Sequence, residues 1–194
     1  MIGIYGGSFN PVHNGHVELV RQLQKKHPFE TLYVVPSKIP PHKKQFQIEE
    51  KHRLSMVKLA LQSIEGVEVS DVELRSNEVS YAMNTIDHFK KRFPNEKIFF
   101  IMGTDAFEVL PQWYGFPDVF FKCSYLVVTR KGVDSKKTDA VLKTLPRSTD
   151  GNQLKFIELN LPQISSTEVR EKVEQGLPIS KLVPKSVEEY LKKL

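Results

Sequence analysis

GGSFNPVHNGH, residues 6–16, follows the apolar start MIGIY of this 194-residue chain. Residues 2–5 predict a buried strand, and Gly6 and Gly7 allow a sharp turn that brings the backbone close to a ligand. The spacing of Val17, Val20 and Leu23 predicts a helix over residues 15–26. A glycine turn between a strand and a helix N-terminus is a favourable place for a phosphate group.

Apolar runs and helical patterns alternate along the rest of the chain. Further strands are expected at residues 31–35, 67–74, 97–102, 124–129 and 155–159. Helices are expected at residues 49–63 (with Leu54, Val57 and Leu61 as its apolar stripe), 81–92, 105–110, 117–122, 134–144, from Ser165 to a C-cap at Gly176, and 184–193. The pattern predicts one α/β domain over residues 1–194. We expect a doubly wound, Rossmann-like parallel sheet with helices on both faces and a C-terminal helical segment.

The composition narrows the class of protein. The net charge of +5 could favour nucleic acid, but no arginine-rich run or aromatic-basic interleaving is present, so solvated basic faces or a polyanionic small ligand explain it better. Apolar runs are too short to cross a bilayer, and the start leaves no room for a signal peptide. Cys123 is the only cysteine, which excludes an internal disulfide. We expect a cytoplasmic protein that binds neither membrane nor nucleic acid.

Several polar motifs directly follow predicted strands: GGSFNPVHNGH, PSKIPPHKK (36–44), GTDAF (103–107) and TRKG (129–132). They converge on the carboxyl edge of the sheet, where doubly wound folds bind ligands. His13 and His16 could hold a metal, donate to phosphate, or only cap the helix. The metal interpretation is the weaker functional one, because zinc requires three or four ligands and no further cluster is evident.

GGSFNPVHNGH resembles the G-G-[ST]-F-[DN]-P-x-H-x-G-H signature of the nucleotidyltransferase superfamily, and ISSTEVR (164–170) resembles its second signature. Within the superfamily, PPHK (40–43), SYAMNT (80–85), FIMGTDAF (100–107), QWY (112–114) and VVTRKG (127–132) are similar to bacterial nicotinate-nucleotide adenylyltransferases. The chain departs from that pattern at Ala82, often threonine, and Lys131, often proline.

The resemblance implies transfer of the adenylyl group from ATP to nicotinate mononucleotide, with release of pyrophosphate. The attacking phosphate is already anionic, so alignment and charge stabilisation would suffice. The resemblance implies that His16, His13, Lys43 and Arg170 are catalytic. It implies an ATP site formed by Gly6, Gly7, Ser8, Phe9, His13, His16, Gly103, Asp105, Ile164, Ser165, Ser166 and Arg170. Mg²⁺ is expected with ATP and no protein metal ligand is named.

For the acceptor, the resemblance implies binding by His42, Lys43, Thr85, Trp113, Tyr114 and Arg130. Trp113 would stack on the pyridine ring, while amides of Thr85 and Tyr114 would approach the carboxylate. Each assignment has a simpler structural alternative. Lys43 could be a solvated lysine, Trp113 a core or rim aromatic, Asp105 a helix N-cap, and Ser165 only a cap.

Two other functions stay open from the sequence. The first is a related nucleotidyltransferase that uses nicotinamide mononucleotide, pantetheine phosphate or a polyol phosphate. The second is a non-catalytic nucleotide sensor or nucleic-acid-binding module on the same fold. The chain could act as a monomer or a small homo-oligomer.

Overall fold

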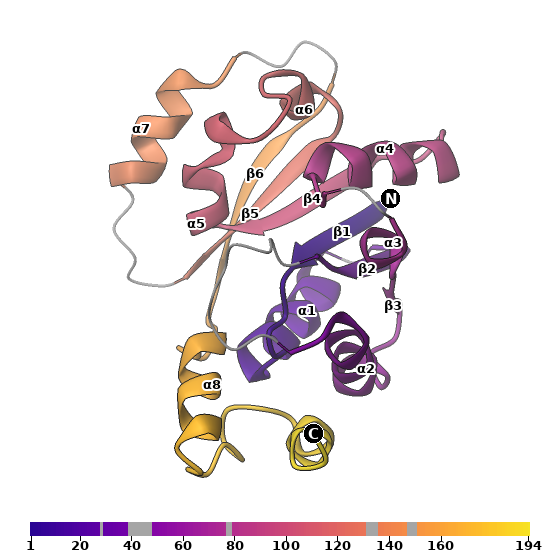
Figure 1. Ribbon diagram of the computed structural model, residues 1–194. Coiled ribbons are helices and arrows are strands. Elements are labelled where there is room, and N and C mark those ends of the chain that lie inside the picture. The colour runs from indigo at the N-terminus through magenta and orange to yellow at the C-terminus, as the bar shows by residue number, and fades with distance from the viewer. Residues whose placement is uncertain (28, 39–47, 77–78, 131–135, 147–150) are drawn as a thin grey trace.

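The computed structural model describes residues 1–194 except 28, 39–47, 77–78, 131–135 and 147–150. At its centre six strands form one sheet in the order β3-β2-β1-β4-β5-β6, and every pair is parallel (Figure 1). The strands are β1 Ile2–Gly7, β2 Thr31–Pro36, β3 Val67–Val69, β4 Ile98–Gly103, β5 Ser124–Arg130 and β6 Leu154–Leu159. The strand order reverses between β1 and β4. The predicted doubly wound parallel sheet is therefore confirmed, and its switch point lies at the end of β1.

Helices cover both faces of the sheet, as predicted. The described helices are α1 Asn14–Lys26, α2 Glu50–Leu61, α3 Val72–Arg75, α4 Ala82–Arg92, α5 Thr104–Glu108, η1 Leu110–Gln112, α6 Asp118–Phe121, α7 Lys136–Thr144, α8 Ser166–Glu174 and α9 Lys185–Leu191. Figure 1 shows α4 to α7 on one side of the sheet and α1, α2, α8 and α9 on the other. Alternation along each strand feeds two cores, because Ile4 packs with the α4–α7 side and Tyr5 with the α1–α2 side.

The predicted strand over residues 67–74 is wrong in its second half. Only Val67–Val69 pairs with β2, and residues 72–75 form α3. The Ser70 amide donates to the Val34 carbonyl at 3.0 Å, and the Leu74 and Arg75 amides then donate to the Asp71 carbonyl. Ser70 and Asp71 are turn-forming residues, so the chain leaves the sheet edge although the apolar alternation continues.

Local signals placed both ends of α8 correctly. The Ser165 hydroxyl accepts a hydrogen bond from the Glu168 amide at 3.1 Å, as an N-cap does. Gly176 follows the helix with φ +66°, and the Leu177 amide donates to the Lys172 carbonyl at 2.8 Å. This left-handed position is the one that glycine adopts at low cost after a helix.

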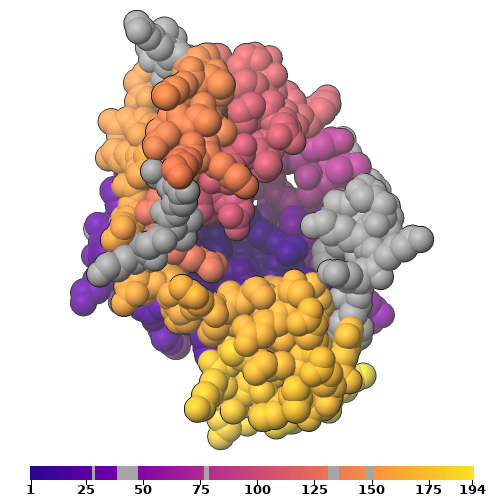
Figure 2. Space-filling view, turned by 90° about the vertical axis from the view of Figure 1, so that its left-hand side faces the viewer, coloured from indigo at the N-terminus to yellow at the C-terminus, as the bar shows by residue number. Residues whose placement is uncertain are grey.

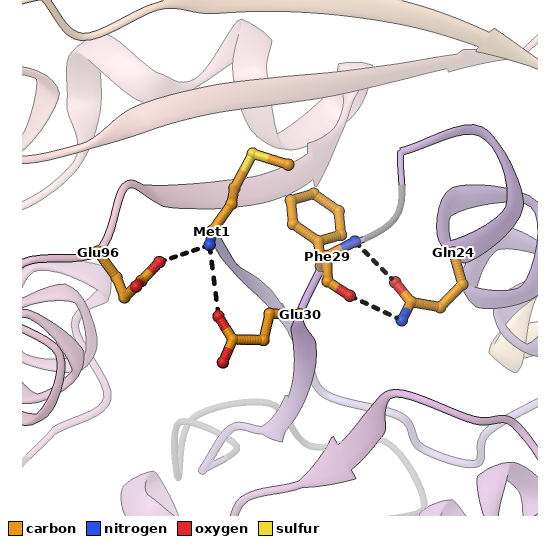
Figure 3. Close-up of polar contacts among 5 residues, drawn as sticks. All are labelled: Met1, Gln24, Phe29, Glu30 and Glu96. Carbon is orange, nitrogen blue, oxygen red and sulfur yellow. Dashed lines mark hydrogen bonds and ion pairs between the residues drawn. The ribbon is translucent and has the colours of Figure 1, made fainter.

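The edge of the sheet opposite the site is held by polar contacts (Figure 3). The Met1 ammonium group forms ion pairs with Glu96 and Glu30, and the Gln24 side chain bonds both the amide and the carbonyl of Phe29. These contacts tie the start of β1 to the segments that precede β2 and β4. Within the part of the chain that the structure describes, no helix has the length and apolar character needed to cross a bilayer.

Candidate active site

A pocket of about 490 Å³ opens beyond the carboxyl ends of β1 and β4. Figure 2 shows the molecule hollowed above its N-terminal segment, with the C-terminal segment forming one wall. Six of the predicted site residues line this pocket: Gly6, Gly7, Gly103, Asp105, Trp113 and Tyr114. The structure thus brings together residues from β1, β4, α5 and the segment after η1, at the position where a doubly wound sheet binds its ligand.

The turn after β1 has an unusual backbone. Phe9 has φ +44°, a left-handed conformation that a residue with a Cβ adopts at a cost of about 1–2 kcal/mol. The Phe9 ring is buried, with its edge toward Tyr5 at 5.6 Å and toward His16 at 5.0 Å between ring centroids. This packing offsets the strain. Phe9, predicted as an ATP contact, thus supports the turn through its side chain.

His13 and His16 lie together at the N-terminus of α1. Their rings stack at 3.7 Å between centroids, and the His13 amide donates to Nδ1 of His16 at 3.2 Å. Since Nδ1 of His16 accepts this bond, the neutral ring carries its proton on Nε2, which is the nitrogen available as a donor. His13 is the N-cap residue of α1. The helix-capping alternative is thus confirmed for His13, and phosphate binding by the two histidines stays a prediction.

Both histidines are neutral at pH 7 in the empty protein. Burial, helped by the Arg130 guanidinium, lowers the pKa of His13 to about 4. Burial, His13 and Arg130 together hold the pKa of His16 well below its usual 6.5. A bound polyphosphate would act in the opposite direction, because nearby negative charge favours the imidazolium form. Arg130, the last residue of β5, thus contributes positive charge that acts on both histidines.

The second sequence signature meets the first one directly. The Ser166 hydroxyl donates to the Pro11 carbonyl at 2.9 Å, and Nη1 of Arg170 donates to the Asn10 carbonyl at 2.7 Å. Ile164 is buried just before α8, while Ser165 is exposed and caps that helix. Segments more than 150 residues apart in the sequence are therefore bonded to each other at the turn after β1.

On the acceptor side, the Trp113 indole stands edge-on to Phe100, 5.8 Å between ring centroids and 82° between planes. It is partly exposed, and the Tyr114 ring stacks on Tyr81 at 4.4 Å with 62% of Tyr114 exposed. Trp113 thus lines the pocket and also packs against the core on the α4–α7 side of the sheet. Asp105 lines the pocket in the first turn of α5, whose N-cap is Gly103, so the N-cap alternative for Asp105 is wrong.

Thr85 does not line this pocket. It is 2% exposed, its amide donates to the Tyr81 carbonyl at 3.3 Å, and its hydroxyl donates to Oε1 of Glu73 at 2.5 Å. Glu73 itself lines the pocket, and burial raises its pKa above the usual value although hydrogen bonds from Thr85 and Ser80 act against the shift. Sequence reasoning missed Glu73, because it placed residue 73 in the second half of a predicted strand, where the structure has helix α3.

Three of the singled-out residues, His42, Lys43 and Lys131, fall outside the described residues. Ile48, the first described residue after His42 and Lys43, donates its amide to the Asn10 side chain at 3.0 Å. Ser8 is exposed in the turn that follows β1. Among the described residues, no group of three His, Cys, Asp or Glu side chains is placed to hold a metal ion.

The 3-2-1-4-5-6 sheet, with a glycine turn, paired histidines and a serine-capped helix at its switch point, defines a protein of the nucleotidyltransferase class. Residues 4–172 match the family model described as Cytidylyltransferase-like. A probable nicotinate-nucleotide adenylyltransferase of Thermosipho melanesiensis is 38% identical over 98% of this chain and 94% of its own. The nicotinate-nucleotide adenylyltransferase of Bacillus subtilis is 31% identical, with the same coverage.

Solved structures support the fold. A nicotinic acid mononucleotide adenylyltransferase from Plasmodium falciparum complexed with NaAD has a TM-score of 0.77 at 20% identity, and covers 99% of this chain and 94% of that one. The same enzyme complexed with APC has a TM-score of 0.76. The chain belongs to the cytidylyltransferase-like family and, within it, to the nicotinate-nucleotide adenylyltransferases.

Proposed function

We propose that this protein transfers the adenylyl group of ATP to the phosphate of nicotinate mononucleotide, releasing pyrophosphate and forming nicotinate adenine dinucleotide. The observation that carries the proposal is the contact between the two signature segments, Ser166 to Pro11 and Arg170 to Asn10, beside a pocket with a rim tryptophan. Together they provide adjacent places for a triphosphate and for an aromatic acceptor.

The reaction needs little chemistry from the side chains. The acceptor phosphate oxygen attacks the α-phosphorus of ATP as the bond to the pyrophosphate oxygen breaks, so the protein has to align both groups and stabilise charge. His16 would donate from Nε2 to the transferring phosphoryl group, and the amides of Gly7 and Ser8 would bind phosphate oxygens. We place the outer phosphates between the α1 and α8 N-termini, beside His13 and Ser165.

Lys43 and His42 would reach the phosphates from the segment that ends at Ile48. We propose that Mg²⁺ enters with ATP, held by phosphate oxygens and water, because Mg²⁺ keeps much of its hydration shell when it binds phosphates. The acceptor's pyridine ring would stack on Trp113, and its carboxylate would lie toward Tyr114 and the start of α4. Asp105 would accept from a ribose hydroxyl, and Arg130 would add positive charge.

We propose a cytoplasmic enzyme that acts as one domain, as a monomer or a small homo-oligomer.

The decisive experiment is a pyrophosphate-release assay on the purified chain with ATP, Mg²⁺ and one acceptor at a time. Nicotinate mononucleotide should give the highest kcat/KM, and mass spectrometry should identify the dinucleotide product. Nicotinamide mononucleotide and phosphopantetheine are the matched competitors. Faster turnover with either competitor would reassign the substrate, and ATP binding without pyrophosphate release under all conditions would indicate a nucleotide sensor.

A further inference from the structure

Arg53 is completely buried behind the turn after β1. Its exposed fraction is 0%, and it lies on the inner face of α2. Its Nη1 donates to the Ser8 carbonyl at 2.5 Å, and its Nε donates to the Ile48 carbonyl at 3.2 Å. One guanidinium therefore bonds two parts of the chain: Ser8 in the turn that follows β1, and Ile48 just before α2.

The carbonyl oxygens of this turn are engaged by donors from neighbouring helices. Arg53 bonds the oxygen of Ser8, Arg170 that of Asn10 at 2.7 Å, and Ser166 that of Pro11 at 2.9 Å. Carbonyl oxygens carry partial negative charge and would repel an anion in the site. Their engagement by the protein leaves the turn with a net excess of donors and cations, which suits a polyphosphate.

The bonds around Ile48 make this a joint rather than a single contact. The Ile48 amide donates to the Asn10 side chain at 3.0 Å, while the Ile48 carbonyl accepts from Arg53. The Ile48 amide is thus bonded directly to Asn10, and the Ile48 carbonyl is linked to Ser8 through Arg53. These bonds couple the position of the turn to the position of Ile48.

The charge of Arg53 is not neutralised by an ion pair with any described residue, and its Nη2 has no hydrogen-bond partner among them. Burial lowers the pKa of Arg53, with a smaller opposing effect from Glu50. A buried charge without a partner carries a desolvation cost. An anion bound in front of the turn would offset part of this desolvation cost by its attraction to the Arg53 charge.

We propose that Arg53 is a positioning residue for the phosphate groups of ATP. It joins Ser8 of the turn to Ile48, and it places positive charge behind the phosphates. The inference rests on the proposed function in that it takes ATP as the ligand. It goes further in assigning a role to a side chain that does not touch the pocket.

The test compares ATP with adenosine, which shares the nucleoside but lacks the phosphates. Binding of each to the full chain is measured by calorimetry, with Mg²⁺ present and no acceptor. In Arg53→Met, which keeps the volume but removes the charge and both bonds, we expect the Kd for ATP to rise about tenfold or more, because hydrogen bonds to charged groups contribute on that scale. The Kd for adenosine should change less than about twofold.

Two further variants complete the design. Arg53→Lys keeps the charge but cannot reach both carbonyls in a fixed fork, so we expect ATP binding to weaken about threefold, with adenosine unchanged. Arg21→Met, at an exposed position of α1, removes an equal charge far from the turn and should alter neither ligand. Should Arg53→Met fail to fold, Arg53→Lys carries the comparison.

Equal weakening of ATP and adenosine would mean that Arg53 only supports the fold, and this would overturn the proposal. Unchanged ATP binding in both Arg53 variants would overturn it as well. Since these measurements need no acceptor and no turnover, they are independent of the pyrophosphate-release assay. A wild-type protein that binds ATP but forms no product would refute the proposed function and leave this test intact.

Discussion

At the residue scale, the main feature of the site is the arrangement and protonation of the two stacked histidines, His13 and His16. His13 and His16 are stacked at 3.7 Å, and both are kept neutral by burial and by nearby positive charge. The His13 amide fixes the tautomer of His16 at Nδ1. Nε2 of His16 thereby carries the ring proton, and we propose that it donates to the reacting phosphate.

Replacement of His16 should therefore affect turnover more than binding. In His16→Ala we expect kcat to fall about 10²–10³-fold, the scale of a lost transition-state donor. The KM for ATP should change less than about threefold, because amides of the turn and α8 still bind phosphates. Steady-state kinetics with saturating nicotinate mononucleotide measures both values. A near-normal kcat would remove His16 from the mechanism.

Trp113, which lines the pocket, is the residue that we propose for binding the acceptor ring. Trp113→Ala should raise the KM for nicotinate mononucleotide about tenfold, through loss of stacking and apolar contact, and leave the KM for ATP nearly unchanged. Trp113→Phe is the matched control, and it should recover most of the affinity because it keeps an aromatic face. An unchanged acceptor KM in Trp113→Ala would show that the indole serves only the rim.

Two glycines of neighbouring strands should respond oppositely to alanine. A Cβ at Gly3 would lie 2.8 Å from Leu32, whereas a Cβ at Gly103 would meet no atom of the described residues within 4 Å. Gly3→Ala should lower Tm, at about 2–4 °C per kcal/mol of overpacking in a chain of this size. Gly103→Ala should keep its Tm but weaken ATP several-fold.

Thermal unfolding and ATP calorimetry on the two variants make this comparison. A stable Gly103→Ala variant that binds ATP normally would show that the space in front of Gly103 is not used by the nucleotide. Gly3→Ala, in contrast, should bind ATP normally at temperatures where it is folded, since it lies at the far end of β1.

At the scale of elements, the first turn of α1 is the part of the helix that positions site residues. His13 caps the helix, and Gly15 lies directly below the His13 ring. A Cβ at Gly15 would be 3.0 Å from Cε1 and Nδ1 of His13, and 3.4 Å from the Pro162 carbonyl oxygen. The glycine between the two histidines thus leaves room for the ring of the first one.

Gly15→Ala should separate helix stability from function. Alanine is favoured over glycine in a helix by up to about 1 kcal/mol, so Tm should stay close to the wild-type value. The His13 ring must shift by a few tenths of an ångström, and its stacked partner with it, so we expect kcat to fall about tenfold. Arg21→Ala, exposed on the same helix, is the control. Normal turnover in Gly15→Ala would contradict this account.

At the scale of the whole molecule, the candidate site lies where the turn after β1 contacts helices α2 and α8. Residues 8–11 are bonded to α2 by Arg53 and to α8 by Ser166 and Arg170. The charges gathered there affect the stability of the protein as well as its ligand binding. The two neutral histidines make this effect measurable as a function of pH.

Acid should destabilise the empty protein through these histidines. Folding lowers the pKa of His13 to about 4 and holds the pKa of His16 well below its usual 6.5, so below about pH 6.5 the unfolded chain binds more protons than the native one. Stability contributed by the pair is therefore present above about pH 6.5 and is lost as the pH falls. The drop in Tm from pH 7 to 5 should be smaller in a His13→Gln, His16→Gln double variant. An equal drop would show that other groups dominate.

Bound ATP should reduce the acid sensitivity of the wild type, because the phosphates favour the protonated imidazoles. The same melts repeated with saturating ATP and Mg²⁺ test this point. The double variant, in which no imidazole is left at these positions, should show no such protection beyond the general effect of ligand binding.

The order of strands and helices followed from local periodicity, because burial on one face repeats with the period of the element. Thus α1, β4 and the caps of α8 were predicted within one or two residues. Residues 67–74 were not, because apolar alternation is compatible with a strand and with a turn into a short helix. Ser70 and Asp71 decide between them through bonds that depend on the sheet edge.

For the site, the sequence by itself determined the family and the types of side chain that its two signatures contain. Both signatures are defined by residue type and spacing, so they can be recognised without knowledge of their contacts. Only the tertiary structure decided that Arg53 lies inside at the head of the face formed by Met56, Val57, Ala60 and Leu61, and that Glu73 bonds Thr85. A charged residue on an apolar face was the available signal for Arg53. Its partners, the carbonyls of Ser8 and Ile48, could not be read from periodicity, because such bonds join segments by the path of the folded chain.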